Sequence, residues 1–154
     1  MRTAHIPASH RDLLEGPYDA ALTAVTPDGQ LHITPVWCNL EGDDILVNTM
    51  RGFRKERSMR ANPKVTLFIS DPQQPLRQIE IRGAVVEMTE TGAEEHLNQL
   101  TRLYVGKDEA AFFGDCVPAA LRATYLPVRV RIAPRRIRVQ SDGRPRCQER
   151  QSGL

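Results

Sequence analysis

The chain has few of the features that mark membrane, secreted or metal-dependent proteins. No apolar run approaches the ~20 residues that a membrane-spanning helix needs, and residues 1–5 lead into polar sequence rather than an apolar signal segment. The three cysteines lie far apart, and none has the C-x-x-C spacing of zinc sites and redox pairs. We therefore expect a protein of the reducing cytoplasm, with no membrane span, no disulfide framework and no metal site.

Catalytic motifs are also missing. The sequence contains no G-x-G-x-x-G, no G-x-x-x-x-G-K-[ST], no H-E-x-x-H and no G-x-S-x-G. The four histidines show no ligand spacing, and no nucleophile or acid–base pair stands out. We expect no catalytic side chain, which leaves reactions whose chemistry a bound cofactor carries.

What is present fits one soluble domain. The chain has 154 residues, of which 40% are hydrophobic and 26% charged, an ordinary composition for a globular protein. We divide it into a leader with a short helix at residues 1–12, a single domain at residues 13–140, and a polar, Arg-rich tail at residues 141–154 that we expect to be disordered.

Short alternating apolar runs between turn signals predict an antiparallel sheet. Two turns, Pro27-Asp28-Gly29 and Glu41-Gly42-Asp43-Asp44, separate three strands, the second of which is expected to run over residues 31–38. Further strands are predicted near residues 65–69, 79–88, 128–132 and 137–139. The expected fold class is mainly β: a small barrel with flanking helices over its openings, since closure removes exposed strand edges.

Two helices are expected to interrupt the strands. A short basic helix over residues 53–61 should end at Asn62-Pro63, because a residue before proline disfavours the helical region. A second helix should start at the capping-box sequence Thr91-Gly92-Ala93-Glu94, with Leu97 and Leu100 on its apolar face.

The junction before the basic helix is the best candidate for a binding site. Thr49 offers a hydroxyl, Gly52 permits close backbone approach, and Arg54 and Lys55 add positive charge to a helix N-terminus. Together these features suit a phosphate group. Spacing alone supports a solvated, charged helix face equally well. Nucleic-acid binding is not expected, because the chain has only 5% aromatic residues and no recognition motif.

Several segments together resemble one family. Thr34-Pro35-Val36-Trp37, the Glu41–Asp44 turn, the strand at residues 45–49, Lys55 and Asn62-Pro63-Lys64-Val65 resemble the split-barrel flavin-binding family. This is the pyridoxamine 5′-phosphate oxidase-like superfamily, or flavin/deazaflavin oxidoreductases. Residues 79–83, followed by the helix at 94–104 and Gly106, are similar to its coenzyme F420-dependent branch. The resemblance covers roughly residues 13–139.

The resemblance implies a split β-barrel and a homodimer with two cofactor sites at the subunit interface. It implies a reductase that transfers a hydride between coenzyme F420 and the electrophilic double bond of a small organic substrate. An FMN-binding oxidoreductase is the alternative, followed by a non-catalytic protein that binds a flavin, haem or another tetrapyrrole. The positions that match the family's cofactor-binding residues are Thr34, Pro35, Val36, Val47, Asn48, Thr49, Arg54 and Lys55.

The chain departs from this branch at two places near the expected site. Phe53 stands where an arginine is common, two positions before the lysine. Ser58-Met59 replaces a usual Asn-Leu pair. Both departures bear on how the cofactor is held rather than on the fold.

Overall fold

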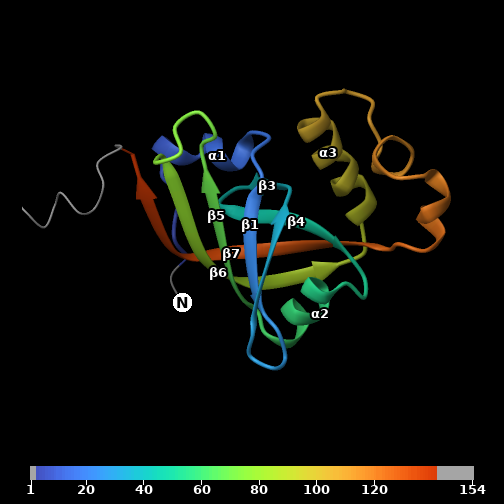
Figure 1. Ribbon diagram of the computed structural model, residues 1–154, viewed down its shortest axis with the longest axis horizontal. Helices are drawn as coiled ribbons and strands as arrows, with labels where there is room; N and C mark the ends of the chain where they lie inside the picture. The colour runs from blue at the N-terminus through green and yellow to red at the C-terminus, as the bar shows by residue number, and fades with distance from the viewer. Residues whose placement is uncertain (1–2, 142–154) are drawn as a thin grey trace, which may run out of the picture.

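A single antiparallel sheet of seven strands, curled on itself, forms the body of the protein in the computed structural model, which describes residues 3–141 (Figure 1). The strands are β1 (Ala20–Val25), β2 (Leu31–Val36), β3 (Cys38–Glu41), β4 (Asp44–Met50), β5 (Lys64–Ser70), β6 (Gln78–Thr89) and β7 (Pro127–Gln140). The helical elements are η1 (Ala8–His10), α1 (Asp12–Glu15), α2 (Arg54–Ala61), α3 (Ala93–Val105), η2 (Phe112–Cys116) and η3 (Ala119–Ala123).

The order of the strands explains how the sheet curls. It runs β2-β1-β5-β6-β7-β4-β3, so β2 and β3 form the two edges. Only Trp37 separates these two edge strands along the chain, and the sheet must therefore bend until its edges approach each other at Trp37. We call this junction the seam. The expected fold class, a mainly β split barrel with flanking helices, is confirmed, whereas the single strand expected over residues 31–38 is wrong because it breaks at the seam.

Apolar side chains that alternate along the strands fill the interior. Leu22, Ile45 and Leu67 are among the fully buried residues of this core. Leu13 and Leu14 of α1 enter it, and Met59 of α2 does the same. In Figure 1, α1 and α2 lie at opposite ends of the barrel. The helices thus cover its openings, as the pattern of short strands and intervening helices predicts.

The last two predicted strands are one. β7 runs unbroken beside β6, and the register shifts where Gly83 pairs with Pro134. A Cβ on Gly83 would lie 2.7 Å from the backbone oxygen of Ala133, so only glycine fits at this bulge. The bulge absorbs the irregularity that proline introduces, and the strand continues to Gln140.

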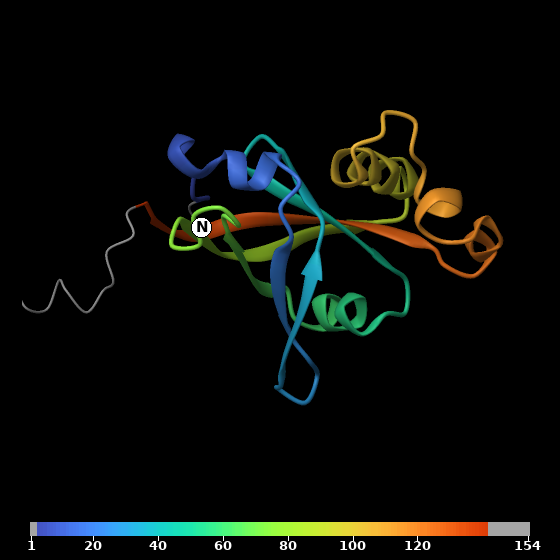
Figure 2. The same cartoon turned by 45° about the horizontal axis from the view of Figure 1, so that its top comes forward.

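Helix α3 lies outside the barrel, against β7 and β4 (Figure 2). The expected capping box is wrong: Gly92 is the N-cap, with a φ of 70°, and among the described residues no side chain caps this helix end. Within residues 3–141, no helix is both long enough and apolar enough to span a membrane. Of the tail expected to be disordered, all but Ser141 lies outside the described residues.

Candidate functional site

Two cavities border helix α2. The first, of about 380 Å³, lies beside the seam, and we call it the seam cavity. The second, of about 390 Å³, lies between α2 and the β1–β2 turn, and we call it the hairpin cavity. The seam cavity takes its walls from the seam, the end of β4, the start of α2, helix α3 and η2: Asp19, Pro35, Val36, Trp37, Asn48, Thr49, Met50, Phe53, Lys55, Leu97, Leu100 and Phe112.

Trp37 and Phe112 line the seam cavity, and Trp37 also stacks on Tyr104. The rings of Trp37 and Tyr104 stack with centroids 5.0 Å apart, and Phe112 meets Trp37 edge-on at 6.4 Å. The Tyr104 hydroxyl donates to the Tyr18 carbonyl at 2.8 Å and accepts from the Cys38 N–H at 3.1 Å. Burial raises the pKa of Tyr104 well above its usual value and that of Cys38 to about 11. Both groups stay neutral at physiological pH, so neither acts as a nucleophile beside the seam cavity.

A chain of side-chain hydrogen bonds fixes Asn48 at the rim of β4. His96 Nε2 lies 2.9 Å from Asn39 Oδ1, an atom that only accepts, so Nε2 carries the proton. His96 Nδ1 is then the acceptor for Asn48 Nδ2 at 3.2 Å, and that same Nδ2 donates to the Ala93 carbonyl at 2.9 Å. Burial, followed by the charge of Arg129, lowers the pKa of His96 to about 4, which keeps it neutral.

Two polar atoms in the seam cavity's wall have no partner within residues 3–141. They are Asn48 Oδ1 and Thr49 Oγ1, both buried. The two amide protons of Asn48 are already used, so its remaining oxygen can act only as an acceptor. Buried polar atoms without partners are uncommon in folded proteins. This arrangement fits a cavity whose hydrogen bonding is completed by a ligand with polar atoms at one edge.

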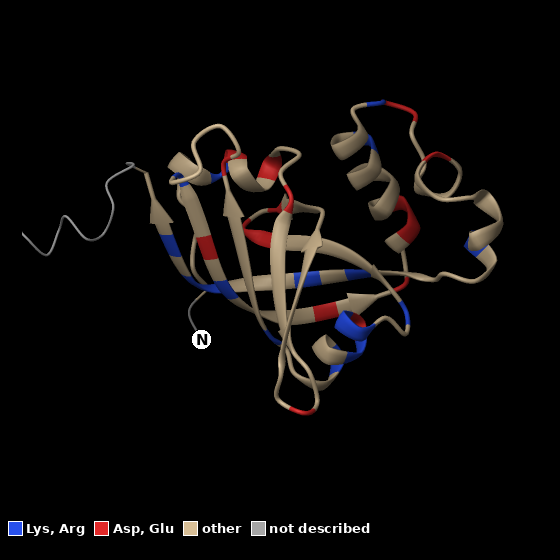
Figure 3. Ribbon diagram, viewed as in Figure 1, with Lys and Arg blue, Asp and Glu red and all other residues tan. Residues whose placement is uncertain are grey.

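The positive charge near the seam cavity comes from the start of α2. Lys55 is half-buried, its Nζ lies 3.4 Å from Thr34 Oγ1, and burial lowers its pKa. Glu56 orders the preceding loop by accepting a hydrogen bond from the Gly52 N–H at 3.1 Å. Figure 3 shows basic residues on α2 and along β7. Those of β7 that lie near the site are paired: Arg129 with Glu87, and Arg131 with Glu41 and Asp44.

The structure brings most of the predicted site residues to one place. The seam cavity is lined by Pro35, Val36, Asn48, Thr49 and Lys55. Arg54 instead lines the hairpin cavity, and Thr34 reaches the seam cavity only through its contact with Lys55. Val47 is buried in the barrel core, with 1% of its surface exposed.

Sequence reasoning missed the groups that support these residues. His96 and Tyr104 lie on α3, far along the chain from the residues that they contact. Their helical spacing indicates only that this part of α3 packs against something. Within residues 3–141, no group of three or more His, Cys, Asp or Glu side chains is placed to hold a metal ion.

Comparison with known proteins gives a consistent result. The family model described as pyridoxamine 5′-phosphate oxidase matches residues 6–138. A solved F420 reductase is 23% identical with a TM-score of 0.72, covering 86% of this chain and 98% of that one. A putative pyridoxamine 5′-phosphate oxidase from Listeria innocua is 23% identical with a TM-score of 0.55, covering 79% and 87%. A FAD-binding protein from Mesorhizobium loti is 19% identical with a TM-score of 0.59, covering 89% and 96%. No curated protein sequence matches. At these identities the structural likeness establishes the fold.

Proposed function

Because the chain belongs to the pyridoxamine 5′-phosphate oxidase family, we propose that it is an oxidoreductase that uses a flavin-type cofactor in the seam cavity. Coenzyme F420 is the cofactor that we propose, and FMN is the alternative. The observation that carries the proposal is the seam cavity itself, where apolar and aromatic walls meet unpaired polar atoms on one side and Lys55 on the other.

Each part of the cavity has a role in this proposal. Lys55 and Arg54 would hold the cofactor phosphate, since charge-assisted hydrogen bonds are the strong ones. The backbone of Thr34, Pro35 and Val36, with Val47 behind it, would border the ring system. Asn48 and Thr49 would bind its polar edge. Once bound, the cofactor supplies the hydride chemistry, and these side chains contribute position and the exclusion of water.

We propose F420 rather than FMN as the cofactor for two reasons, one from the sequence and one from a similar structure. Residues 79–106 are similar to the F420-dependent branch, and one similar structure is an F420 reductase. The substrate proposed for this reading is a small organic molecule with an electrophilic double bond. Reduced F420 would pass its hydride to that bond, next to the apolar wall formed by Met50, Leu97 and Phe112.

The first experiment is a fluorescence titration of cofactor-free protein with F420 and, separately, with FMN. Tighter binding of F420 would support the deazaflavin reductase and would lead to a screen of enone acceptors. Preference for FMN would move the proposal to the flavin oxidoreductase. Binding of neither would contradict both readings and would direct the search to haem and other tetrapyrroles.

A homodimer is the proposed assembly, and an exposed apolar strip supports it. Leu31 and Ile33 of β2 are 71% and 64% exposed, and Phe68 of β5, which pairs with the other side of β1, is 40% exposed. Large contiguous apolar patches of this kind typically mark an interface. Ile33→Glu should convert a dimer into a monomer in size-exclusion chromatography with light scattering. Val105→Glu, at another exposed apolar residue, is the matched control. A wild-type monomer at micromolar concentration, with cofactor bound, would contradict the proposal.

A further inference from the structure

The hydrogen bonds behind Asn48 have a direction that one backbone atom fixes. The carbonyl of Ala93, the first residue of α3, can only accept, so the Asn48 atom 2.9 Å from it is the amide nitrogen Nδ2. The same Nδ2 lies 3.2 Å from His96 Nδ1, which must then be an acceptor as well. The proton of the neutral imidazole is therefore on Nε2, which donates to Asn39 Oδ1 at 2.9 Å. We call these four residues the Asn48 network.

The Asn48 network leaves a single atom of the amide for the seam cavity. Both protons of Asn48 Nδ2 are directed at protein acceptors, so Oδ1 is the atom that remains, and it can only accept. Asn48 lines the seam cavity, and its Oδ1 is buried without a partner within residues 3–141. Turning the amide over would place Oδ1 against the Ala93 carbonyl and His96 Nδ1, which are both acceptors. His96 therefore opposes the reversed orientation.

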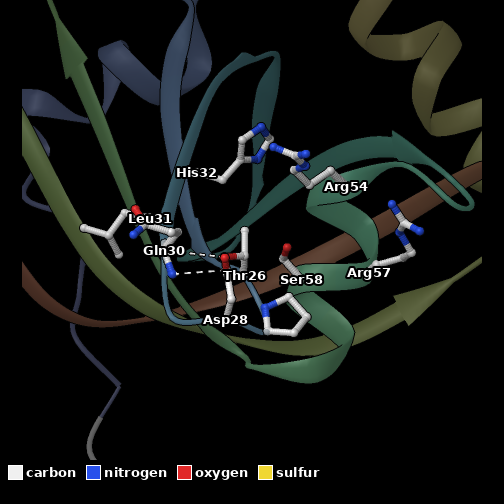
Figure 4. A pocket seen from close by; sticks show the side chains of 9 residues that line it. Thr26, Asp28, Gln30, Leu31, His32, Arg54, Arg57 and Ser58 are labelled. Atoms are coloured by element: carbon white, nitrogen blue, oxygen red, sulfur yellow. Dashed lines mark hydrogen bonds between the residues drawn. The ribbon is translucent and has the colours of Figure 1, made fainter.

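Thr49 adds a second kind of polar atom to the same cavity. Its hydroxyl is buried and has no partner in the described part of the chain, and a hydroxyl can either donate or accept. Two other unpartnered atoms, Ser58 Oγ and His32 Nδ1, belong to residues of the hairpin cavity instead (Figure 4). The seam cavity thus offers a fixed acceptor and an adaptable hydroxyl. An N–H group next to a carbonyl is the ligand edge that satisfies both.

The surroundings of His96 keep it neutral, as the Asn48 network requires. His96 is 3% exposed, and burial is the main reason that its pKa falls to about 4. The positive charge of Arg129 on β7 lowers this pKa further, while the negative charge of Glu41 on β3 raises it by less. A protonated imidazole would direct an N–H from Nδ1 at the Asn48 amide nitrogen, where no acceptor is present.

We propose that His96 is a positioning residue, which holds the Asn48 amide so that the seam cavity accepts a hydrogen bond there and selects ligands with an N–H at that edge. His96 acts through Asn48 and does not contact the ligand itself. The ligand class is a cyclic imide or lactam, and the pyrimidinedione ring of flavins and deazaflavins is of this class. The identity of the ligand rests on the proposed function, whereas the direction of the Asn48 network depends on the protein alone.

Methylation at N3 of the flavin ring tests the selection. FMN and N3-methyl FMN differ at this N–H, and the wild-type protein should bind FMN roughly tenfold or more tightly, because the methylated ring leaves a buried acceptor unpaired. In His96→Phe, whose ring neither donates nor accepts, the preference should shrink to about threefold or less. His96→Gln should keep most of it, since glutamine can accept from Asn48 and donate to Asn39.

Thr101→Val is the matched control for a general disturbance of α3. Thr101 is buried in the same helix and donates to the Leu97 carbonyl within that helix, so its loss should leave the preference for FMN over N3-methyl FMN unchanged. An equal preference in wild type and His96→Phe would overturn the proposal. An equal reduction by Thr101→Val would overturn it too, because the effect would then belong to the packing of α3.

Nitrogen-15 NMR of the ligand-free wild-type protein reads the network without any variant. Protonated and unprotonated imidazole nitrogens have well-separated shifts, and at pH 7 we expect the proton of His96 on Nε2 and none on Nδ1. A proton on Nδ1, with or without one on Nε2, would overturn the proposed role of His96, because Asn48 could not then donate to it.

A smaller pair of ligands separates this proposal from the proposed function. Should neither FMN nor F420 bind, the proposed function fails, and 1-methyluracil and 1,3-dimethyluracil then take their place as a bare imide ring with and without its N–H. If only 1-methyluracil shifts the side-chain amide signals of Asn48, the role of His96 and the selection both stand. If neither compound or both compounds shift these signals, the selection is overturned.

Discussion

The seam cavity and the hairpin cavity share a helix but are built in opposite ways. The seam cavity has buried and half-buried walls of Trp37, Met50, Leu97 and Leu100, whose neighbours fix them on several sides. The hairpin cavity is lined mostly by residues with polar or charged side chains, which come from α2, the β1–β2 turn and the start of β2. The walls of the seam cavity are therefore part of the folded core, whereas those of the hairpin cavity lie at its periphery. Mutations should affect stability more in the seam cavity than in the hairpin cavity.

The largest effect is expected from truncating the wall of the seam cavity. Leu100 is 1% exposed, so Leu100→Ala should lower the free energy of unfolding by about 2–5 kcal/mol through lost burial and the space left behind. Arg57→Ala, in the exposed part of the hairpin cavity, should change it by less than about 0.5 kcal/mol. Urea denaturation measures both. Similar losses in the two variants would show that the contrast between the cavities is wrong.

The second test uses the pH dependence of stability. The pKa of His96 is lowered from 6.5 to about 4 in the folded protein, so below pH 6.5 the unfolded chain takes up a proton that the folded chain refuses. The free energy of unfolding should therefore fall as pH drops from 6.5 to about 4, by roughly 3 kcal/mol, and then level off.

His96→Gln is the control for this titration, because glutamine has no charge to gain. Its stability should be lower at pH 7 and should fall less steeply between pH 6.5 and 4. Parallel curves for the variant and the wild type would mean that His96 does not set the pH response and that the hydrogen bonds to Asn39 and Asn48 are not the anchor described above.

A smaller effect is expected from removing the cation of the seam cavity. Lys55→Ala should weaken binding of F420 or FMN by about 1.5–3 kcal/mol, through loss of one charge-assisted bond to the phosphate. Arg57→Ala should leave FMN affinity unchanged, since Arg57 lines only the hairpin cavity. A titration in which Lys55→Ala binds the cofactor as tightly as the wild type would remove Lys55 from the site.

Local signals in the sequence were sufficient for the turns and for the end of α2, but not for how the strands divide. The short β1–β2 and β3–β4 turns carry Asp-Gly and Gly-Asp pairs, and α2 stops at Asn62-Pro63 as expected. The break at Trp37 has no such signal, because it arises from the closure of the whole sheet. Pro134 has the opposite effect: it suggests an interruption, but Gly83 on the partner strand makes room for a bulge.

Some contacts of the candidate site could likewise be predicted from the sequence, and others could not. Lys55 and Thr34 could be placed together because a resemblance connects their segments, and the contact between them is present. The partners of Asn48 could not, since His96 reaches it from a helix 48 residues further along the chain. Hydrogen bonds between distant segments have no periodicity, and no spacing rule would identify them.

Trp37 connects β2 and β3, the two edge strands of the sheet, so closure of the sheet and formation of the seam cavity are linked. The β1–β5 and β4–β7 pairings join distant parts of the chain, and the closed sheet needs both of them. The seam cavity consequently exists only in the completely folded chain. A ligand that binds there lowers the free energy of the folded state alone. The midpoint of thermal unfolding should therefore rise with the logarithm of ligand concentration above Kd, so that a melting curve reports occupancy of the cavity without any turnover.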